Sequence, residues 1–258
     1  MNRCLIVLPT FNEAGNIVPL LHEIFQVSPG ADVLVVDDNS PDGTGREVKE
    51  VQLKETRLHL LERPGKNGLA EAYLAGFSWG LERSYEIFVQ MDADFSHRPK
   101  DLPRLFDALA TEDLVMGCRY LPEGGIGGWS RTRLFVSRSG NAYARTMLGL
   151  PFLDLTGGYN AWRREVLQQM RLSTIQSKGY AFQIELKYRA FLCGYRLKEI
   201  PIVFEKRRAG VSKMSAAFIW EAAINVLKLR GETGAEIAQG GANLGASTSP
   251  SQARKDRL

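Results

Sequence analysis

The sequence predicts an α/β protein in which a doubly wound, mostly parallel sheet carries helices on both faces. Short apolar segments of strand length alternate along the chain with segments whose apolar residues recur at helical spacing. This alternation is typical of parallel sheets joined by crossover helices. The chain has 258 residues, of which 44% are hydrophobic and 24% are charged, so it can bury a substantial core.

The expected elements can be assigned in order along the chain. Strands are expected at residues 4–8, 33–36, 58–61, 87–90 and 114–117, and helices follow the first four of them. The second half is expected to contain helices at residues 131–148, 163–170, 179–192 and 215–230, and one strand at residues 196–204. Pro201 predicts that this strand lies near a sheet edge, because proline cannot donate to a ladder. Residues 121–129 are expected to be a glycine-rich loop, and residues 154–159 a turn.

Residues 1–230 are expected to form one domain. Residues 231–258 are rich in Gly, Ala, Ser and Gln and are expected to be a disordered tail. No apolar run is long enough for a membrane span, and no signal peptide is expected. The cysteines, Cys4, Cys118 and Cys193, show neither metal-ligand spacing nor a disulfide framework, which is typical of a reducing, cytoplasmic setting.

The fourth expected strand is followed by two aspartates, Asp92 and Asp94. Residues i and i+2 of an extended chain point to the same side, so both carboxylates can face one site. A cation between them relieves their mutual repulsion. Because Mg²⁺ is commonly held by one or two carboxylates together with substrate phosphates, the pair predicts a metal–phosphate site. The alternative is a plain turn after a strand, which is common for an isolated Asp-x-Asp.

Two further loops, at residues 9–13 and 37–38, also follow expected strands, and in doubly wound sheets ligands bind beyond the carboxyl ends of strands. No glycine-rich dinucleotide or phosphate-binding-loop motif occurs, which disfavours dinucleotide-dependent oxidoreductases and phosphate-binding-loop hydrolases. A bound diphosphate would therefore need a metal and basic side chains. The net charge of +4 is concentrated, since residues 119–145 contain five arginines and one glutamate.

Seven motifs occur in order along residues 3–230. They are Pro9-Thr10-Phe11-Asn12-Glu13, Val36-Asp37-Asp38-Asn39-Ser40-Pro41-Asp42-Gly43-Thr44, Lys66-x-Gly68-Leu69, Met91-Asp92-Ala93-Asp94-x-Ser96-His97, Gly117-x-Arg119-Tyr120, Gly179-Tyr180-Ala181-Phe182-Gln183-x-Glu185 and Phe204-x-x-Arg207-x-x-Gly210-x-Ser212-Lys213. Together they resemble the inverting glycosyltransferases of family 2, which have the GT-A fold. The resemblance is strongest to the dolichol-phosphate or polyprenol-phosphate mannosyltransferases, in a form without a transmembrane anchor.

The resemblance implies a role for each matching position. Nucleotide and donor binding is implied for Pro9, Phe11, Glu13, Val36, Asp37, Asp38, Asp92, Ala93, Asp94, Arg207 and Lys213. A Mg²⁺ or Mn²⁺ ion is implied at Asp92, Asp94 and Ser96. Binding of the acceptor phosphate is implied for Arg119, Arg133 and Ser137, on an acceptor side formed by helices within residues 119–152. The residues expected to carry the reaction are Asp94, Arg119, Arg133 and Arg207.

The implied reaction transfers a hexose, most simply mannose from GDP-mannose, to a polyprenyl or dolichyl monophosphate with inversion at the anomeric carbon. A phosphate monoester is already anionic near neutrality, so this acceptor needs no general base. The implied partners are the nucleotide sugar, the lipid phosphate and the cytoplasmic face of a membrane, to which the protein would bind peripherally, with no nucleic acid. Arginines mixed with apolar residues at 135–152, and the apolar helix at 215–230, favour such a surface, although either segment could instead pack on the sheet.

Two departures leave alternatives open. Ser96 stands where some relatives have a Gln metal ligand, and Asn160 stands where many have Arg. The same fold could transfer glucose from UDP-glucose or use a glycan hydroxyl, for which Glu185 or Asp154 would be the candidate base. A nucleotide-sugar-binding sensor without turnover is the non-enzymatic alternative.

Overall fold

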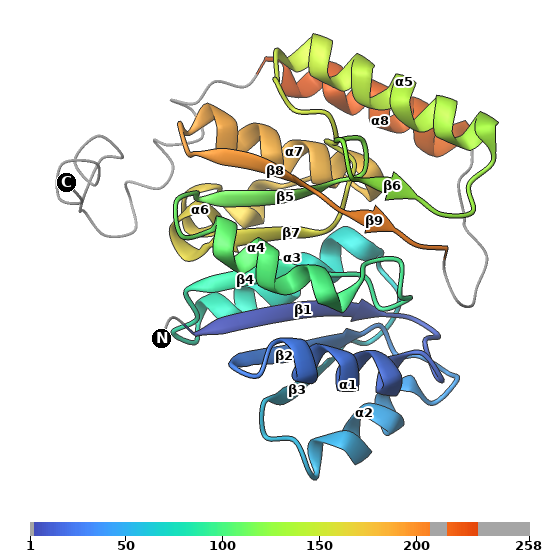
Figure 1. Ribbon diagram of the computed structural model, residues 1–258, viewed down its shortest axis with the longest axis vertical. Coiled ribbons are helices and arrows are strands. Elements are labelled where there is room, and N and C mark those ends of the chain that lie inside the picture. Colours follow the sequence, from blue (N-terminus) through green and yellow to red (C-terminus); the bar gives the residue numbers. More distant parts are fainter. Residues whose placement is uncertain (1–2, 207–215, 232–258) are drawn as a thin grey trace, which may run out of the picture.

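The computed structural model describes residues 3–206 and 216–231 (Figure 1). Arg207, Lys213 and the tail expected at residues 231–258, apart from Gly231 itself, lie outside these ranges.

The described chain is organised around a seven-stranded sheet with the order β3-β2-β1-β4-β7-β5-β8. The strands are β1 Cys4–Thr10, β2 Ala31–Asp37, β3 Leu58–Glu62, β4 Ile87–Gln90, β5 Leu114–Cys118, β7 Asn160–Arg163 and β8 Leu197–Pro201. All neighbouring pairs are parallel except those of β7, which runs antiparallel to both β4 and β5. The predicted doubly wound, mostly parallel sheet is therefore confirmed, and β8 lies at its edge as Pro201 predicted.

Two sequence-based predictions in the second half were wrong. The glycine-rich segment contains a short strand, β6 Gly125–Ile126, which pairs with β9 Val203–Phe204 in a separate two-stranded sheet. The expected single strand at 196–204 is therefore divided between two sheets. The change of sheet occurs at Ile202, whose carbonyl accepts a hydrogen bond from Gly125 N at 3.0 Å. Strand β7 was also missed, because residues 160–163 lie between a predicted turn and a predicted helix.

Helices cover both faces of the large sheet, as expected (Figure 1). They are α1 Ile17–Val27, α2 Thr44–Gln52, α3 Leu69–Leu81, α4 Leu102–Ala108, α5 Arg131–Leu148, α6 Arg164–Gln169, α7 Gly179–Leu192 and α8 Ala216–Leu229, with 3-10 turns at Pro99–Asp101 and Leu172–Thr174. Because side chains alternate along a strand, each strand contributes to two separate apolar layers. One layer joins α1 and α4 to the sheet, and the other joins α3, α6 and α7 to the opposite face.

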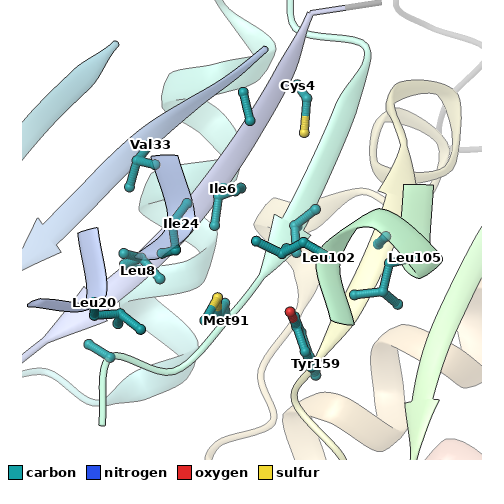
Figure 2. Packing of buried hydrophobic residues seen from close by; sticks show 14 of the residues in the cluster. Cys4, Ile6, Leu8, Leu20, Ile24, Val33, Met91, Leu102, Leu105 and Tyr159 are labelled. Atoms are coloured by element: carbon teal, nitrogen blue, oxygen red, sulfur yellow. The ribbon is translucent and has the colours of Figure 1, made fainter. Parts of the chain in front are cut away.

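Figure 2 shows the first layer, where Leu20 and Ile24 of α1 lie over Ile6 and Leu8 of β1. Leu102 and Leu105 of α4 pack in the same cluster, next to Met91 and Tyr159. These side chains are at most 1% exposed. Burial of each contributes roughly 1.5–3 kcal/mol to folding, so this layer fixes the positions of the strands that carry the site.

A third apolar cluster joins α5, α7 and α8 beyond the β8 end of the sheet. Helices α5 and α8 lie side by side there (Figure 1). Tyr143 of α5 donates its hydroxyl proton to the carbonyl of Ala223 in α8 at 3.2 Å. Among the described residues, no helix is both long and apolar enough to cross a membrane.

Candidate active site

The ends of β1 and β2 meet at one carboxylate, Asp37. It accepts hydrogen bonds from the hydroxyls of Thr10 and Ser40 at 2.7 and 2.6 Å, and from the backbone N–H of Ser40 at 2.8 Å. The side chain is 3% exposed. Asp37 therefore holds together the two loops that follow these strands, which is a positioning role in addition to the nucleotide contact expected from the sequence.

The next carboxylate, Asp38, faces Arg63, with 2.9 Å between Oδ1 and Nη1. Burial raises the pKa of Asp38, although Arg63 and a backbone hydrogen bond from Asn67 oppose the rise. Lys66 places its ammonium group 3.9 Å from the ring centre of Phe11. Asp38, Phe11 and these two cations therefore lie close together beyond the ends of β1 and β2.

The remaining residues expected at the nucleotide have different surroundings. The Glu13 carboxylate accepts a hydrogen bond from the side-chain amide of Asn16 at 2.9 Å, and the Glu13 backbone N–H donates to Thr44 Oγ1 at 3.0 Å. Pro9 is partly buried at the end of β1. Val36 and Ala93 are buried in opposite apolar layers, so their side chains cannot reach a ligand. Only their backbones are available to one.

Asp92 and Asp94 occupy the turn after β4, near the middle of the sheet. Asp92 accepts the hydroxyl proton of Tyr73 at 3.1 Å, and its backbone N–H donates to His97 Nδ1 at 3.0 Å. Asp94 accepts the backbone N–H and the hydroxyl of Ser96 at 2.9 and 2.5 Å. Phe95, between Asp94 and Ser96, has a positive φ of 66°, so the chain turns sharply here.

His97 is neutral in this arrangement. Burial lowers its pKa, which outweighs the opposite influence of Asp92 and Asp94. A neutral ring agrees with the geometry, because a protonated Nδ1 could not accept the Asp92 N–H. The ring stacks on Tyr159 with 4.7 Å between ring centres. His97 therefore orients the aspartate turn.

The residues at this turn fit a divalent metal ion whose coordination shell is completed by phosphate oxygens of the substrate. Asp92 is partly exposed, whereas Asp94 is buried and accepts two hydrogen bonds from Ser96. Asp92 therefore offers the accessible carboxylate, and Asp94 would contribute from the buried side of the turn. Among the described residues, no group of three or more His, Cys, Asp or Glu side chains forms a complete metal cage. Mg²⁺ and similar hard cations commonly bind through one or two carboxylates plus phosphate oxygens, and such binding requires no cage.

Arg119, at the end of β5, forms a buried ion pair with Asp154. Its Nε and Nη2 atoms donate to the two carboxylate oxygens, each at 2.7 Å, and its backbone N–H donates to the same carboxylate at 3.0 Å. Its Nη2 also donates to Thr156 at 2.9 Å. Burial raises the pKa of Asp154 when taken alone, but Arg119 and Lys187 outweigh this and hold it below its usual range.

Lys187 binds the backbone of the turn that carries Asp154. Its ammonium group is completely buried and donates to the carbonyls of Asp154, Leu155 and Gly157 at 3.0, 3.1 and 2.8 Å. All three ammonium protons are thus accounted for. Burial lowers the pKa of Lys187 to about 8, against the pull of Asp154 and Glu199. Lys187 therefore fixes the turn that carries Asp154.

The other acceptor-side residues expected from the sequence lie on α5. Ser130 caps the helix by accepting the Arg133 N–H at 3.2 Å, and Ser137 shares a hydrogen bond of 2.7 Å with the Tyr120 hydroxyl. The guanidinium carbon of Arg133 lies 4.0 Å from the ring centre of Trp129. That of Arg119 lies 5.4 Å from the same ring, so both arginines meet at one indole.

A cavity of about 230 Å³ opens next to Arg119 and Trp129. Arg119, Thr156 and Ser137 contribute its polar lining. The rest of the wall is formed mainly by apolar and aromatic side chains of α5, α7 and α8, together with Trp129. The cavity is therefore predominantly apolar, and Arg119 and two hydroxyl groups form a small polar area of its wall.

Beneath the aspartate turn lies a buried group of amides that the sequence did not reveal. Asn160 Nδ2 donates to Gln90 Oε1 at 3.0 Å and to Gln183 Oε1 at 3.2 Å, and the indole of Trp162 donates to Gln90 at 2.9 Å. Asn160 and Gln90 face each other in register across β7 and β4. Asn160 is completely buried, so its amide is part of the floor of the site.

The sequence correctly placed the carboxylates at strand ends, and their roles and those of Arg119 and Arg133 stay predictions. It missed Tyr73, Trp129, Lys187 and the pairing of Arg119 with Asp154. These residues were missed because their roles come from contacts between residues far apart along the chain, which a local motif does not show. One signal was available in the sequence. Lys187 lies in a helix with many apolar residues, where a charged side chain is expected to need partners.

Comparison with known structures identifies the fold. Glucosyl-3-phosphoglycerate synthase from Mycobacterium tuberculosis, solved in complex with Mn²⁺, uridine diphosphate and glucosyl-3-phosphoglycerate, matches with a TM-score of 0.65 at 21% identity. The match covers 89% of this chain and 80% of that one. At this identity the likeness shows the fold alone, which is the GT-A fold of glycosyltransferases.

The family follows from the sequence match. Residues 5–171 match glycosyl transferase family 2, and the chain belongs to this family. It is 47% identical to the polyprenol monophosphomannose synthase of Mycolicibacterium smegmatis, over 87% of this chain and 85% of that protein. It is 45% identical to the undecaprenyl-phosphate mannosyltransferase of Micrococcus luteus, over 88% of this chain and 93% of that protein. The resemblance inferred from the motifs is confirmed.

Proposed function

We propose that the protein transfers mannose from GDP-mannose to a polyprenyl monophosphate, with inversion at the anomeric carbon. The names of the two relatives support the sugar and the acceptor class. The observation that carries the proposal is the predominantly apolar cavity with Arg119 and two hydroxyl groups in its wall. A lipid phosphate has two corresponding parts, an anionic head and an apolar chain.

The site suits an acceptor that needs no general base. The two carboxylates that could serve as a base for a hydroxyl acceptor are both bound to buried arginines. Asp154 pairs with Arg119, and Glu185 pairs with Arg189 at 2.7 Å and accepts the Ser177 N–H at 3.2 Å. A phosphate monoester has a second pKa of about 6 and is anionic near neutrality, so it can attack without losing a proton to the protein. This favours the phosphate over the glycan hydroxyl.

On the donor side, Asp37 and Asp38 bind the nucleoside, and Asp92, Asp94 and Ser96 would hold Mg²⁺ or Mn²⁺. When bound, such an ion stabilises the negative charge that develops on the departing diphosphate. Tyr73 and His97 hold Asp92, while the Ser96 hydroxyl holds Asp94. Arg119 and Arg133 receive the acceptor phosphate, and they keep the attacking oxygen close to the donor sugar in spite of the repulsion between two anions.

The protein would work as a peripheral enzyme on the cytoplasmic face of a membrane. A polyprenyl chain stays in the bilayer, since exposure of each CH₂ to water costs about 0.8 kcal/mol. Phe135 of α5 and Ile224 and Leu227 of α8 are 71%, 51% and 53% exposed, on the two helices that lie side by side. Arg131 and Arg138 of α5 are exposed as well and would face anionic headgroups.

The test is a transfer assay with radiolabelled GDP-mannose and undecaprenyl phosphate in detergent or liposomes. The expected result is a mannosyl lipid that requires a divalent cation and is released by mild acid. UDP-glucose in place of GDP-mannose should give far less product. Binding of GDP-mannose without transfer to any lipid phosphate would instead identify a sensor.

A further inference from the structure

Trp129 forms part of the wall of the acceptor cavity, next to Arg119. It follows the β6 strand and Gly128, whose φ of +71° turns the chain, and it precedes the Ser130 cap of α5. The backbone before it is tied to β9, since Gly127 N–H donates to the Phe204 carbonyl at 2.8 Å. The backbone that carries the indole is therefore fixed on both sides of Trp129.

The indole contacts both acceptor-side arginines. Arg133 lies over its ring at 4.0 Å and Arg119 approaches at 5.4 Å. Attraction between a guanidinium group and a π face contributes roughly 0.5–2 kcal/mol, more where water is excluded. Arg133 forms no ion pair with any carboxylate among the described residues, and its buried Nε has no hydrogen-bond partner there. Trp129 is thus the group that orients a cation whose charge no carboxylate cancels.

Trp129 is also tied to the donor side. Phe204 meets its ring edge-to-face at 5.6 Å, and Phe204 also meets the ring of His97 edge-to-face at 5.5 Å. His97 in turn accepts the backbone N–H of Asp92. The indole belongs to a row of aromatic rings that runs from the arginines to the aspartate turn, which limits its movement.

The remaining surface of Trp129 forms part of the wall of the cavity, together with Val136, Tyr143 and Ile184. We propose that Trp129 is the specificity-determining residue that selects a phosphate carrying a prenyl chain over a phosphate without one. Its π face holds the arginines that receive the anion, and its apolar surface receives the first carbons of the chain. This inference rests on the proposed lipid phosphate acceptor.

Calorimetric titration with farnesyl phosphate and with inorganic phosphate tests the inference. The wild-type protein should bind farnesyl phosphate much more tightly than inorganic phosphate. Trp129→Ala should weaken farnesyl phosphate binding by about tenfold or more, because the contact with the chain and the support of the arginines are both lost. Inorganic phosphate binding should weaken less, because it loses only the support of the arginines, and the dissociation constant for GDP-mannose should change least. Trp129→Phe, which keeps an aromatic face, should lose less selectivity than Trp129→Ala.

The matched control is Trp79→Ala on α3. Trp79 makes the same kind of contact, with Arg83 at 4.0 Å, but lies outside the lining of the cavity. Selectivity should be unchanged in this variant. If Trp129→Ala and Trp129→Phe both discriminate as well as the wild type, the role of Trp129 is refuted while the acceptor proposal stands. If the wild type itself neither discriminates nor transfers mannose to a lipid phosphate, the acceptor proposal fails first.

Discussion

Arg119 and Asp154 are joined by two side-chain hydrogen bonds of 2.7 Å in a fully buried site, although 35 residues separate them along the chain. A neutralised arginine would be a poor ligand for a phosphate. Here Lys187 lies on the other side of the Asp154 turn and contributes a second positive charge. The negative charge of Asp154 is thus shared between two cations, although Glu199 also acts on Lys187. Arg119 can therefore still attract an anion.

The pair predicts a large loss of stability in Asp154→Asn. Removal of one partner leaves Arg119 buried without a counter-charge, which costs about 3–5 kcal/mol. Urea unfolding measures the change. Asp113→Asn is a matched control, because Asp113 binds Arg196 through the same two side-chain contacts and the same backbone N–H contact. The Arg196 side chain is 57% exposed, so this loss should be about 1 kcal/mol or less. Equal losses would contradict the analysis of the buried pair.

The same pair predicts how stability depends on pH. The pKa of Asp154 is held below its usual range in the folded protein, so the unfolded chain takes up the proton first as the pH falls. The contribution of the pair is fully present above the unfolded value of about 3.9 and is lost as the pH falls from there through the folded pKa. The difference in unfolding free energy between wild type and Asp154→Asn should therefore be constant from about pH 5 to 7 and shrink below about pH 4. A difference that grows on acidification would give the opposite sign and refute the assignment.

The elements that form the sheet could be predicted because their signal is local. Residues 4–8 and 33–36 are apolar runs bounded by turn residues, and the carboxylates that follow them were correctly placed at the strand ends. The short strands β6 and β7 could not be predicted in this way. Each consists of two to four residues, and their stability comes from partners far along the chain, such as Gln90 opposite Asn160.

The candidate site, too, has features that local sequence predicts and features that depend on distant contacts. Asp92 and Asp94 are recognisable because two carboxylates after a strand are costly without a ligand. The sequence predicted that Arg119 binds phosphate, which stays a prediction, but its pairing with Asp154 depends on where the turn after α5 folds back on β5. The apolar cavity likewise depends on the packing of α5 against α7 and α8, which no single segment encodes. The roles assigned to Arg207 and Lys213 remain predictions, because both residues lie outside the described ranges.

Asp94→Asn should lower turnover by about two orders of magnitude or more, because several kcal/mol of charge stabilisation on the diphosphate would be lost with the metal ligand. Ser96→Ala should have a smaller effect, since the serine backbone N–H still donates to Asp94. Asp107→Asn, on the exposed surface of α4, is the control and should retain activity. Transfer rates and the affinity for Mn²⁺ in the presence of GDP-mannose measure these effects. Full wild-type activity in excess chelator would exclude the metal.

Arg133→Ala should raise the KM for the lipid phosphate and leave the affinity for GDP-mannose nearly unchanged. The physical reason is that Arg133 lies at Trp129 on the acceptor side and forms no contact with Asp92 or Asp94. Arg83→Ala removes an exposed arginine that also lies 4.0 Å from an indole, that of Trp79, but outside the cavity lining, and serves as the control. Initial-rate kinetics with both substrates varied, combined with calorimetry of donor binding, separate the two effects. An equal loss of donor affinity would assign Arg133 to the diphosphate instead.

The exposed apolar residues of α5 and α8 predict binding to anionic membranes. Burial of a phenylalanine side chain is worth roughly 1.5–3 kcal/mol, so Phe135→Glu should reduce partitioning into anionic liposomes by about tenfold or more. Leu53→Glu is the matched control, because Leu53 is even more exposed, at 85%, but follows α2 at the opposite end of the molecule from α5 and α8 (Figure 1). Flotation with liposomes measures both variants, and wild-type binding should rise with the anionic lipid fraction and fall with salt, since each arginine near such a surface contributes about 1 kcal/mol.

If Leu53→Glu impaired binding as much as Phe135→Glu, the α5–α8 surface would not be the docking face. If the wild type stayed in the aqueous fraction even with polyprenyl phosphate present, peripheral membrane binding itself would be ruled out.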